Sequence, residues 1–159
     1  MLNLLFVCTG NTCRSVMAEA LFNHFWWQQE GVITPRVGSA GIIAPEGGDA
    51  TTEVKQVLHE EGIELAKHYS RRLTPEMVST ANLILVMTTD HRNTIERDYP
   101  EAKGKVKLLK EYAPNAYGDN NIADPFGESL QIYRKSMQEI KESILNLIRE
   151  LQEELQEDI

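Results

Sequence analysis

The chain has 159 residues, of which 42% are hydrophobic and 25% are charged, as is typical of one globular domain. Its net charge of −8 argues against nucleic acid as a partner, because phosphate backbones are bound by clustered lysine and arginine. No apolar run approaches the ~18 residues that span a membrane, and the run at residues 4–8 is too short for a signal peptide. We therefore expect no membrane association and a cytoplasmic protein that begins at Met1.

The first predicted unit is a strand, a tight loop and a helix. Residues 2–8 form a continuous apolar run, which is typical of a buried parallel strand. From residue 15 apolar residues recur at every fourth position, which predicts a helix that runs to about residue 31.

Further strands and helices alternate along the middle of the chain. Thr74 and Pro75 mark one helix start, because threonine caps helices well and proline suits the first helical position. The remaining strands are expected at residues 36–41, 83–87 and 105–109, and the helices at residues 51–61, from residue 74 onward and at residues 90–99.

The last third of the chain contains a long loop and a long helix. Residues 111–127 lack periodicity, and a loop longer than ~12–15 residues is usually functional or disordered. Residues 129–155 carry one apolar stripe at helical spacing. The alternation of strands and helices predicts an α/β domain over residues 1–159, with a parallel sheet covered on both faces. Ligands in such folds bind at the carboxyl ends of the strands.

Residues 8–15 follow the first strand and read Cys-Thr-Gly-Asn-Thr-Cys-Arg-Ser. Gly10 allows the backbone to curl, so that successive N–H groups point inward and form an anion-binding nest. The next helix begins here and directs its free N–H groups at the same point. Arg14 can bind two phosphate oxygens with its planar fork. We therefore assign a phosphate-binding loop to Thr9, Gly10, Asn11, Thr12, Cys13 and Ser15.

Cys8 is the expected nucleophile. Helix N-termini and nearby cations favour a thiolate, so we expect Cys8 to be ionised at neutral pH and to attack phosphorus opposite the leaving group. The loop N–H groups and Arg14 would stabilise the transition state, and Ser15 can donate a hydrogen bond to the sulfur. Cys8 and Cys13 are the only cysteines, too few for a disulfide scaffold or a structural zinc site, and we expect no metal.

The departing group needs a proton donor. Asp124 lies in the long loop and precedes Pro125, which would fix its backbone. Asp124 could protonate the leaving group and afterwards activate water. Judged by spacing alone, a turn-forming Asp-Pro pair is an equally good interpretation.

Residues 8–15, together with Asp124, Pro125 and Phe126, resemble the low-molecular-weight protein-tyrosine-phosphatase family, and the resemblance covers essentially the whole chain. It implies a flavodoxin-like three-layer fold with a central four-stranded parallel sheet and helices on both faces. It also implies that neither a metal nor an organic cofactor is needed. The implied roles are nucleophile for Cys8, phosphate clamp for Arg14, and general acid and then base for Asp124.

Four further positions match the family one by one. The resemblance implies that Asn11 shapes the loop through side-chain hydrogen bonds, in a network with Ser39 and His68. Considered without the resemblance, His68 is equally well a loop histidine of no consequence. Cys13 matches a second cysteine that can form a disulfide with Cys8 and protect it from irreversible oxidation. The alternative for Cys13 is a small buried hydrophobic residue.

Several positions depart from the tyrosine-phosphatase pattern and resemble the bacterial protein-arginine-phosphatase branch. Thr12 stands where a bulky aliphatic residue is usual. Phe126 stands where tyrosine is frequent, and glycine follows it. The Leu-Lys-Glu-Tyr sequence at residues 109–112 also resembles that branch. The small hydroxyl side chain of Thr12 leaves room for a polar guanidinium, whereas Phe126 can pack against either flat group.

The first hypothesis is therefore a protein-arginine phosphatase that hydrolyses phosphoarginine in proteins through a phosphocysteine on Cys8. The runner-up is a protein-tyrosine phosphatase with the same mechanism. An arsenate reductase can share the fold and loop but needs further cysteines. A phosphate-binding module without activity would need neither Asp124 nor a thiolate.

The remaining expectations concern partners and the other histidines. We expect phosphorylated proteins as substrates, inorganic phosphate as product or inhibitor, and a monomer. His24, His59 and His91 do not have metal-ligand spacing and are expected at the surface.

Overall fold

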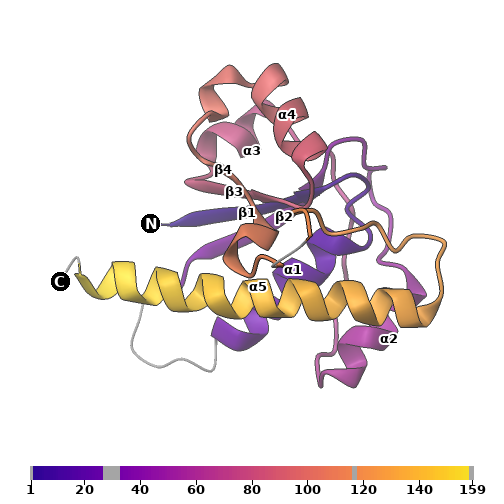
Figure 1. Cartoon of the computed structure of the whole chain (residues 1–159). Coiled ribbons are helices and arrows are strands. Elements are labelled where there is room, and N and C mark those ends of the chain that lie inside the picture. The colour runs from indigo at the N-terminus through magenta and orange to yellow at the C-terminus, as the bar shows by residue number, and fades with distance from the viewer. Residues whose placement is uncertain (1, 27–32, 116–117, 158–159) are drawn as a thin grey trace.

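The computed structural model describes residues 2–26, 33–115 and 118–157, and its centre is a parallel sheet (Figure 1). The strands lie in the order β2-β1-β3-β4 and all pair in parallel. They are β1 (Asn3–Cys8), β2 (Arg36–Gly41), β3 (Leu83–Val86) and β4 (Val106–Leu108). Because β2 lies on one side of β1 and β3 on the other, the loop after β1 lies where the strand order reverses, which is the usual ligand site of such sheets.

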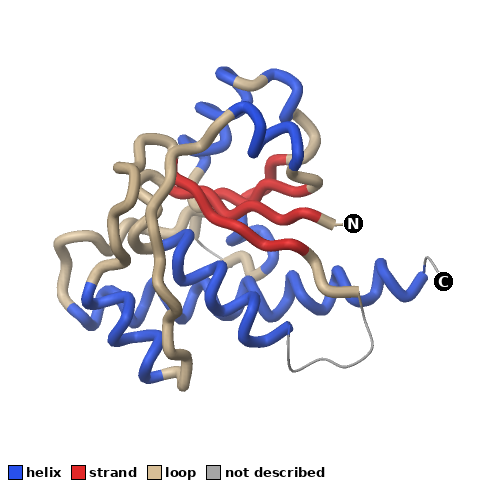
Figure 2. Tube along the Cα trace, turned by 180° about the vertical axis from the view of Figure 1, so that it is seen from behind, coloured by secondary structure: helices blue, strands red, loops and turns tan. Residues whose placement is uncertain are grey.

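Helices cover both faces of the sheet, as Figures 1 and 2 show from opposite sides. The helices α1 and α5 lie on one face, and α3 and α4 lie on the other. The helices are α1 (Arg14–Trp26), α2 (Thr52–Glu60), α3 (Pro75–Thr80), α4 (Thr89–Asp98) and α5 (Leu130–Glu157), with short 3-10 helices η1 (Pro100–Ala102) and η2 (Leu109–Tyr112).

The side chains of β1 alternate between two hydrophobic clusters. Leu4, Phe6 and Cys8 belong to the larger cluster, with α1 and α5, while Leu5 and Val7 belong to the smaller one, with α3 and α4. Successive strand residues point to opposite faces, so this alternation places Cys8 on the same side of the sheet as the helix that follows it. The strand that ends at Cys8 is therefore anchored from both faces.

The helix starts follow from local capping. The side-chain oxygens of Thr51, Thr74 and Thr88 accept hydrogen bonds from backbone N–H groups in the first turns of α2, α3 and α4, respectively. Pro75 occupies the first turn of α3, where its missing N–H costs nothing. The cap at Thr88 fixes the first turn of α4 close to the carboxyl end of β3.

The predicted α/β fold with a four-stranded parallel sheet and helices on both faces is confirmed. The first helix is described as far as Trp26, and the remainder of its predicted span, to residue 31, lies outside the described residues. The predicted start of the loop at residues 111–127 was wrong, because the 3-10 helix η2 extends to Tyr112. Within the described ranges, no helix has the length and apolar character needed to cross a membrane.

Candidate active site

A cavity of about 320 Å³ opens at the carboxyl end of β1. The structure brings the predicted nucleophile, phosphate clamp, general acid and specificity residues to this one place. The cavity is lined by Cys8, Thr9, Gly10, Thr12, Cys13, Arg14, Pro45, Asp124 and Phe126. Cys8 is only 2% exposed, whereas Phe126 is 67% exposed and forms part of the rim. The cavity thus joins an exposed aromatic ring to a buried sulfur.

Asn11 sets the curvature of the loop. It has a φ of 52°, in the left-handed region, where asparagine is tolerated better than most side chains. Its side-chain Nδ2 donates to the hydroxyls of Ser15, at 2.8 Å, and Ser39, at 3.0 Å. Its Oδ1 accepts from the backbone N–H of Arg71 at 3.1 Å. The buried amide thus uses both of its ends to hold the loop in a conformation that it would not adopt alone.

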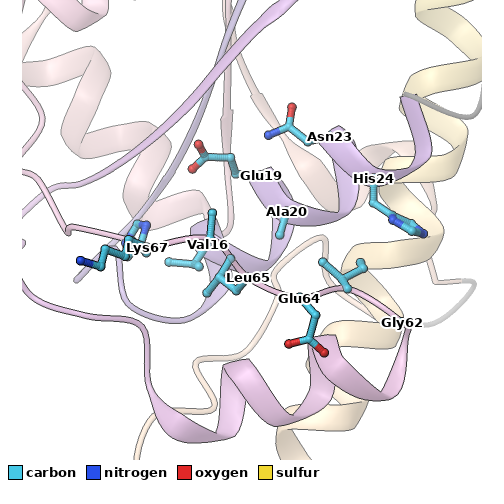
Figure 3. Close-up of a pocket in the computed structure, with 12 residues that line it drawn as sticks. Val16, Glu19, Ala20, Asn23, His24, Gly62, Glu64, Leu65 and Lys67 are labelled. Atoms are coloured by element: carbon cyan, nitrogen blue, oxygen red, sulfur yellow. The ribbon is translucent and has the colours of Figure 1, made fainter.

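The network continues outward from Asn11 to two charged or titratable side chains. The Ser39 hydroxyl donates to the carboxylate of Glu19, and Nε2 of His68 lies 2.7 Å from the backbone oxygen of Asn11. The predicted supporting residues Asn11, Ser39 and His68 therefore do lie together. Glu19 and His68 also line a groove of about 360 Å³ between α1 and residues 62–68 (Figure 3). The back of the loop is thus braced by residues that reach the molecular surface.

The Cys8 sulfur has one hydroxyl partner. Its Sγ lies 3.0 Å from Oγ of Ser15, which itself accepts from Asn11. Because the Ser15 oxygen accepts the amide hydrogen, its own proton is free to point at the sulfur. A hydroxyl proton directed at the sulfur is a contact that can stabilise a thiolate.

Arg14 is held in a fixed orientation beside the cavity. Its side chain is 4% exposed. Nη1 donates to the backbone oxygen of Ile122 at 2.9 Å, and Nη2 donates to Oγ1 of Thr9 at 3.5 Å. Nη2 also lies 3.6 Å from a carboxylate oxygen of Asp124. Within the described part of the chain Nε has no hydrogen-bond partner, so it keeps its donor capacity for a phosphate oxygen.

The loop of Asp124 is tied to the sheet at several points. The backbone N–H of Ile122 donates to the Met87 oxygen at 2.9 Å, just beyond β3. Oδ1 of Asn121 accepts from both the backbone N–H and the hydroxyl of Thr89. The Asp124 side chain is 51% exposed, and its Oδ1 accepts from the N–H of Phe126. The Asp124 carboxylate is therefore open to solvent and to the cavity, while the loop that carries it is held to the sheet.

Cys13 lies behind the loop among hydroxyl groups. Its Sγ is 3.5 Å from the Tyr133 hydroxyl and 3.8 Å from that of Thr51. Burial raises the pKa of the Cys13 thiol, although these hydrogen bonds oppose the shift. Burial, together with the contact to Cys13, also raises the pKa of Tyr133 to about 12. Cys13 therefore stays a neutral thiol at neutral pH, in contrast to the role expected of Cys8.

The expectation that His91 lies at the surface was wrong. It is 6% exposed, and its Nε2 lies 2.9 Å from Oγ1 of Thr9. Burial is the main reason that the pKa of His91 falls to about 4; the charge of Arg14 adds to the shift, while Asp124 and Asp90 oppose it. His91 is therefore a neutral imidazole at neutral pH.

Gly10 was expected to allow the backbone of the loop to curl, but other residues have this role. A Cβ on Gly10 would meet only the Thr12 hydroxyl, at 3.7 Å, which is an ordinary contact, and the left-handed position is Asn11. The close approach occurs instead at Gly41, the end of β2. A Cβ there would lie 2.6 Å from the Thr9 oxygen and 2.9 Å from the Asn11 nitrogen. The loop packs against a glycine of the neighbouring strand.

Sequence reasoning missed Glu19, Arg71 and His91. Glu19 lies one turn into α1, and its carboxylate reaches Ser39 only because α1 packs beside β2, which no local pattern reveals. His91 had a usable signal, since it follows the strand next to β1, and the carboxyl ends of parallel strands share one edge. Among the described residues, no group of three or more histidines, cysteines or carboxylates converges as a metal site requires.

Comparisons with known proteins show which family the chain resembles over nearly its whole length. Residues 3–157 match the family model described as low molecular weight phosphotyrosine protein phosphatase. The chain is 44% identical to a protein-arginine-phosphatase of Geobacillus stearothermophilus, over 95% of this chain and 97% of that protein. It is 41% identical to one of Bacillus subtilis (strain 168), over 99% of each. The structure of YwlE arginine phosphatase from Geobacillus stearothermophilus has a TM-score of 0.87 and 42% identity, covering 99% of this chain and 97% of that chain.

Replacing Gly41 with alanine should impair catalysis by displacing the loop. The added methyl group would overlap backbone atoms of Thr9 and Asn11, which cannot move aside as a flexible side chain can. We expect kcat/KM for p-nitrophenyl phosphate to fall about tenfold or more, and stability to fall by about 1–3 kcal/mol.

Gly104→Ala is the matched control. Gly104 has a φ of 92° and nothing within 4 Å of its Cβ position, so alanine there costs about 1 kcal/mol of backbone strain without touching the loop. We expect the control to lower thermal stability and to keep kcat/KM. Wild-type kcat/KM in Gly41→Ala would contradict this account of the loop.

Proposed function

The chain belongs to the low molecular weight phosphotyrosine protein phosphatase family, and on this premise we propose that it is a protein-arginine phosphatase, which hydrolyses phosphoarginine in proteins through a phosphocysteine intermediate. The observation that carries the choice of substrate is the place of Thr12, which lines the cavity together with Cys8 and Phe126. The two relatives named protein-arginine-phosphatase support the same choice.

The cavity wall favours a polar guanidinium over a flat apolar ring. The Thr12 hydroxyl makes one weak contact, 3.9 Å from the Cys13 sulfur, so it can accept a hydrogen bond from a substrate N–H. A bulky aliphatic side chain at this position would fill that space and favour an aromatic ring. Asp124 lies at the same cavity, where its carboxyl group can hydrogen-bond a guanidine nitrogen. Phe126 can stack on either kind of substrate and does not discriminate.

In the first chemical step the Cys8 thiolate attacks phosphorus. An S–P bond forms as the P–N bond breaks, and the electron pair of that bond stays on the guanidine nitrogen, which takes a proton from Asp124. Arg14 and the loop N–H groups stabilise the charge on the equatorial oxygens. The strongly basic nitrogen is a poor leaving group unless it is protonated, so the position of Asp124 at the cavity is important for this substrate.

In the second step water hydrolyses the phosphocysteine. Asp124, now a carboxylate, removes a proton from water as the water oxygen bonds to phosphorus and the S–P bond breaks. The Ser15 hydroxyl, 3.0 Å from the sulfur, stabilises the departing thiolate. The products are inorganic phosphate, which is also expected to act as an inhibitor, and the regenerated Cys8. No metal or cofactor enters either step.

A protein-tyrosine phosphatase is the second candidate, because the family description names phosphotyrosine and the same residues would act in the same order. The disfavoured alternatives are an arsenate reductase, since both cysteines of the chain lie in one loop, and a phosphate-binding module without activity, since Asp124 and Cys8 meet at one cavity. The proposal includes one phosphatase domain over residues 1–159, acting as a cytoplasmic monomer on phosphorylated proteins.

The substrate choice is tested by kinetics on matched peptides. We expect the wild type to have a higher kcat/KM on phosphoarginine peptides than on phosphotyrosine peptides. We expect Thr12→Ile to shift the ratio of the two kcat/KM values toward phosphotyrosine by about tenfold or more. The aliphatic side chain would fill the space beside the Thr12 hydroxyl and remove a polar group from the cavity wall. Thr12→Ser keeps the hydroxyl and should retain the wild-type preference. An unchanged ratio in Thr12→Ile would refute the role of Thr12.

The covalent mechanism is tested with Cys8→Ser. A serine hydroxyl is a far weaker nucleophile than a thiolate, so turnover of p-nitrophenyl phosphate should fall by about 10⁴-fold or more. Phosphate binding, measured by calorimetry, should persist, because the loop N–H groups and Arg14 remain. Retained turnover in this variant would exclude Cys8 as the nucleophile.

We also propose that Cys13 protects Cys8 from irreversible oxidation. Peroxide converts the Cys8 thiolate to a sulfenic acid, and the Cys13 sulfur then displaces hydroxide, which leaves as water, to form the disulfide. Prolonged peroxide treatment oxidises an unprotected sulfenic acid to the sulfinic acid, so the lost activity should return with dithiothreitol in the wild type and not in Cys13→Ala. Because the pKa of Cys13 is raised by burial, protection should improve as pH increases. Equal recovery in both proteins would show that Cys13 has no protective role.

A further inference from the structure

The hydrogen-bonded pair of Thr9 and His91 joins two strand ends at the cavity. Thr9 directly follows β1, while His91 lies in the first turn of α4, beyond β3. Oγ1 of Thr9 and Nε2 of His91 are 2.9 Å apart, although the residues are 82 positions apart in the chain. The backbone N–H of His91 donates to the capping hydroxyl of Thr88, which fixes the His91 backbone in the first turn of α4. The pair is therefore a rigid bridge across the carboxyl edge of the sheet.

Thr9 is also in contact with the phosphate clamp. Nη2 of Arg14 donates to Oγ1 of Thr9 at 3.5 Å, and Nη1 donates to the backbone oxygen of Ile122 at 2.9 Å. A planar guanidinium that is held at both terminal nitrogens cannot rotate about its long axis without losing one of these bonds. The Thr9 hydroxyl is thus one of the points that define the plane of the Arg14 guanidinium, together with the Ile122 oxygen and the Asp124 carboxylate.

We propose that His91 is a positioning residue for Arg14: it holds the Thr9 hydroxyl, and through it the guanidinium plane that binds the phosphoryl oxygens. This inference rests on the phosphatase chemistry proposed above. It holds for phosphoarginine and phosphotyrosine alike, because both present the same phosphoryl group to Arg14.

We assign the direction of the hydrogen bonds from the donors available. Arg14 can only donate, so the Thr9 oxygen accepts from it. The single Thr9 proton is then free to be donated to Nε2 of His91, in the tautomer that carries its proton on Nδ1. The chain of donors in this arrangement runs from Arg14 to Thr9 to His91. A protonated His91 would make Nε2 a donor, and the Thr9 proton would lose its acceptor.

The surroundings of His91 keep it in the neutral form that this arrangement needs. Burial and the charge of Arg14 lower its pKa to about 4, although Asp124 and Asp90 act in the opposite direction. The Nδ1 atom is buried and has no hydrogen-bond partner among the described residues, which is a cost that an apolar side chain would avoid. Packing alone therefore does not account for a histidine here, whereas an acceptor for Thr9 does.

A double-mutant cycle separates this role from simple packing. Thr9→Val and His91→Phe each keep approximate volume and remove one partner. With p-nitrophenyl phosphate as substrate, we expect each variant to raise the inhibition constant of vanadate about tenfold, and that of phosphate by less. Vanadate adopts the trigonal bipyramidal geometry of the transition state, so its binding depends more on the orientation of Arg14. The double variant should bind vanadate no more weakly than the more impaired of the two single variants, because the two residues act as one unit.

Three further variants complete the test. His91→Gln offers an amide oxygen to Thr9 and should restore most of the vanadate affinity, and Thr9→Ser should behave like the wild type. Thr94→Val removes a hydroxyl one turn further along α4 and should leave both inhibition constants unchanged. Thermal unfolding is measured for every variant. If His91→Phe fails to fold, Thr9→Val and His91→Gln still decide the question.

The proposal is overturned by additive effects in the cycle, by equal losses of phosphate and vanadate affinity, or by unaltered vanadate inhibition in folded His91→Phe. Failure of the proposal about His91 can be distinguished from failure of the proposed function. A wild type that hydrolysed neither phosphoarginine nor aryl phosphates would refute the function. In that case calorimetric binding of vanadate and phosphate to the same variants would still test whether His91 positions Arg14.

Discussion

The left-handed backbone at Asn11 is the constraint on which the geometry of the site depends. Cys8 ends a strand and Arg14 begins a helix, and both face one cavity only because the chain between them curls. An asparagine can take this conformation because its amide bonds to Ser15, Ser39 and the Arg71 N–H. Hydrogen bonds to three separate segments thus offset the energetic cost of the left-handed conformation. They also hold the loop to α1, to β2 and to the backbone at Arg71.

The parallel sheet supplies the remaining groups from distant parts of the chain. Ser39 comes from β2, His91 follows β3, and Asp124 belongs to a loop tied to Met87 at the end of β3. All of them reach the edge at which β1 ends, because parallel strands present their carboxyl ends together. The same arrangement gives the two cysteines different surroundings. Cys8 meets a hydroxyl at the cavity, whereas Cys13 lies behind the loop with a raised pKa.

Local patterns were sufficient to predict the strand, loop and helix around Cys8, since an apolar run and a four-residue period are properties of short segments. Asp124 was ambiguous by spacing; the family resemblance favoured the general acid, and the structure places its carboxylate at the cavity, 3.6 Å from Arg14. His91 and Glu19 were not predicted, because their partners are set by how α4 and α1 pack on the sheet. The role given to Gly10 illustrates the same limit: glycine suggested the curl, but the side-chain network places it at Asn11.

Thr12 differs from its neighbours in the loop because its side chain takes little part in this framework. Asn11, Cys13 and Arg14 are buried and engaged with other segments, while the Thr12 hydroxyl makes one weak contact among the described residues, with the adjacent sulfur. Under the proposed function, a substitution at this position alters which phosphorylated residue is accepted and leaves the network around Asn11 and Arg14 in place. Substrate choice and chemistry are thereby assigned to different side chains of one loop, so that each can be changed by mutation without the other.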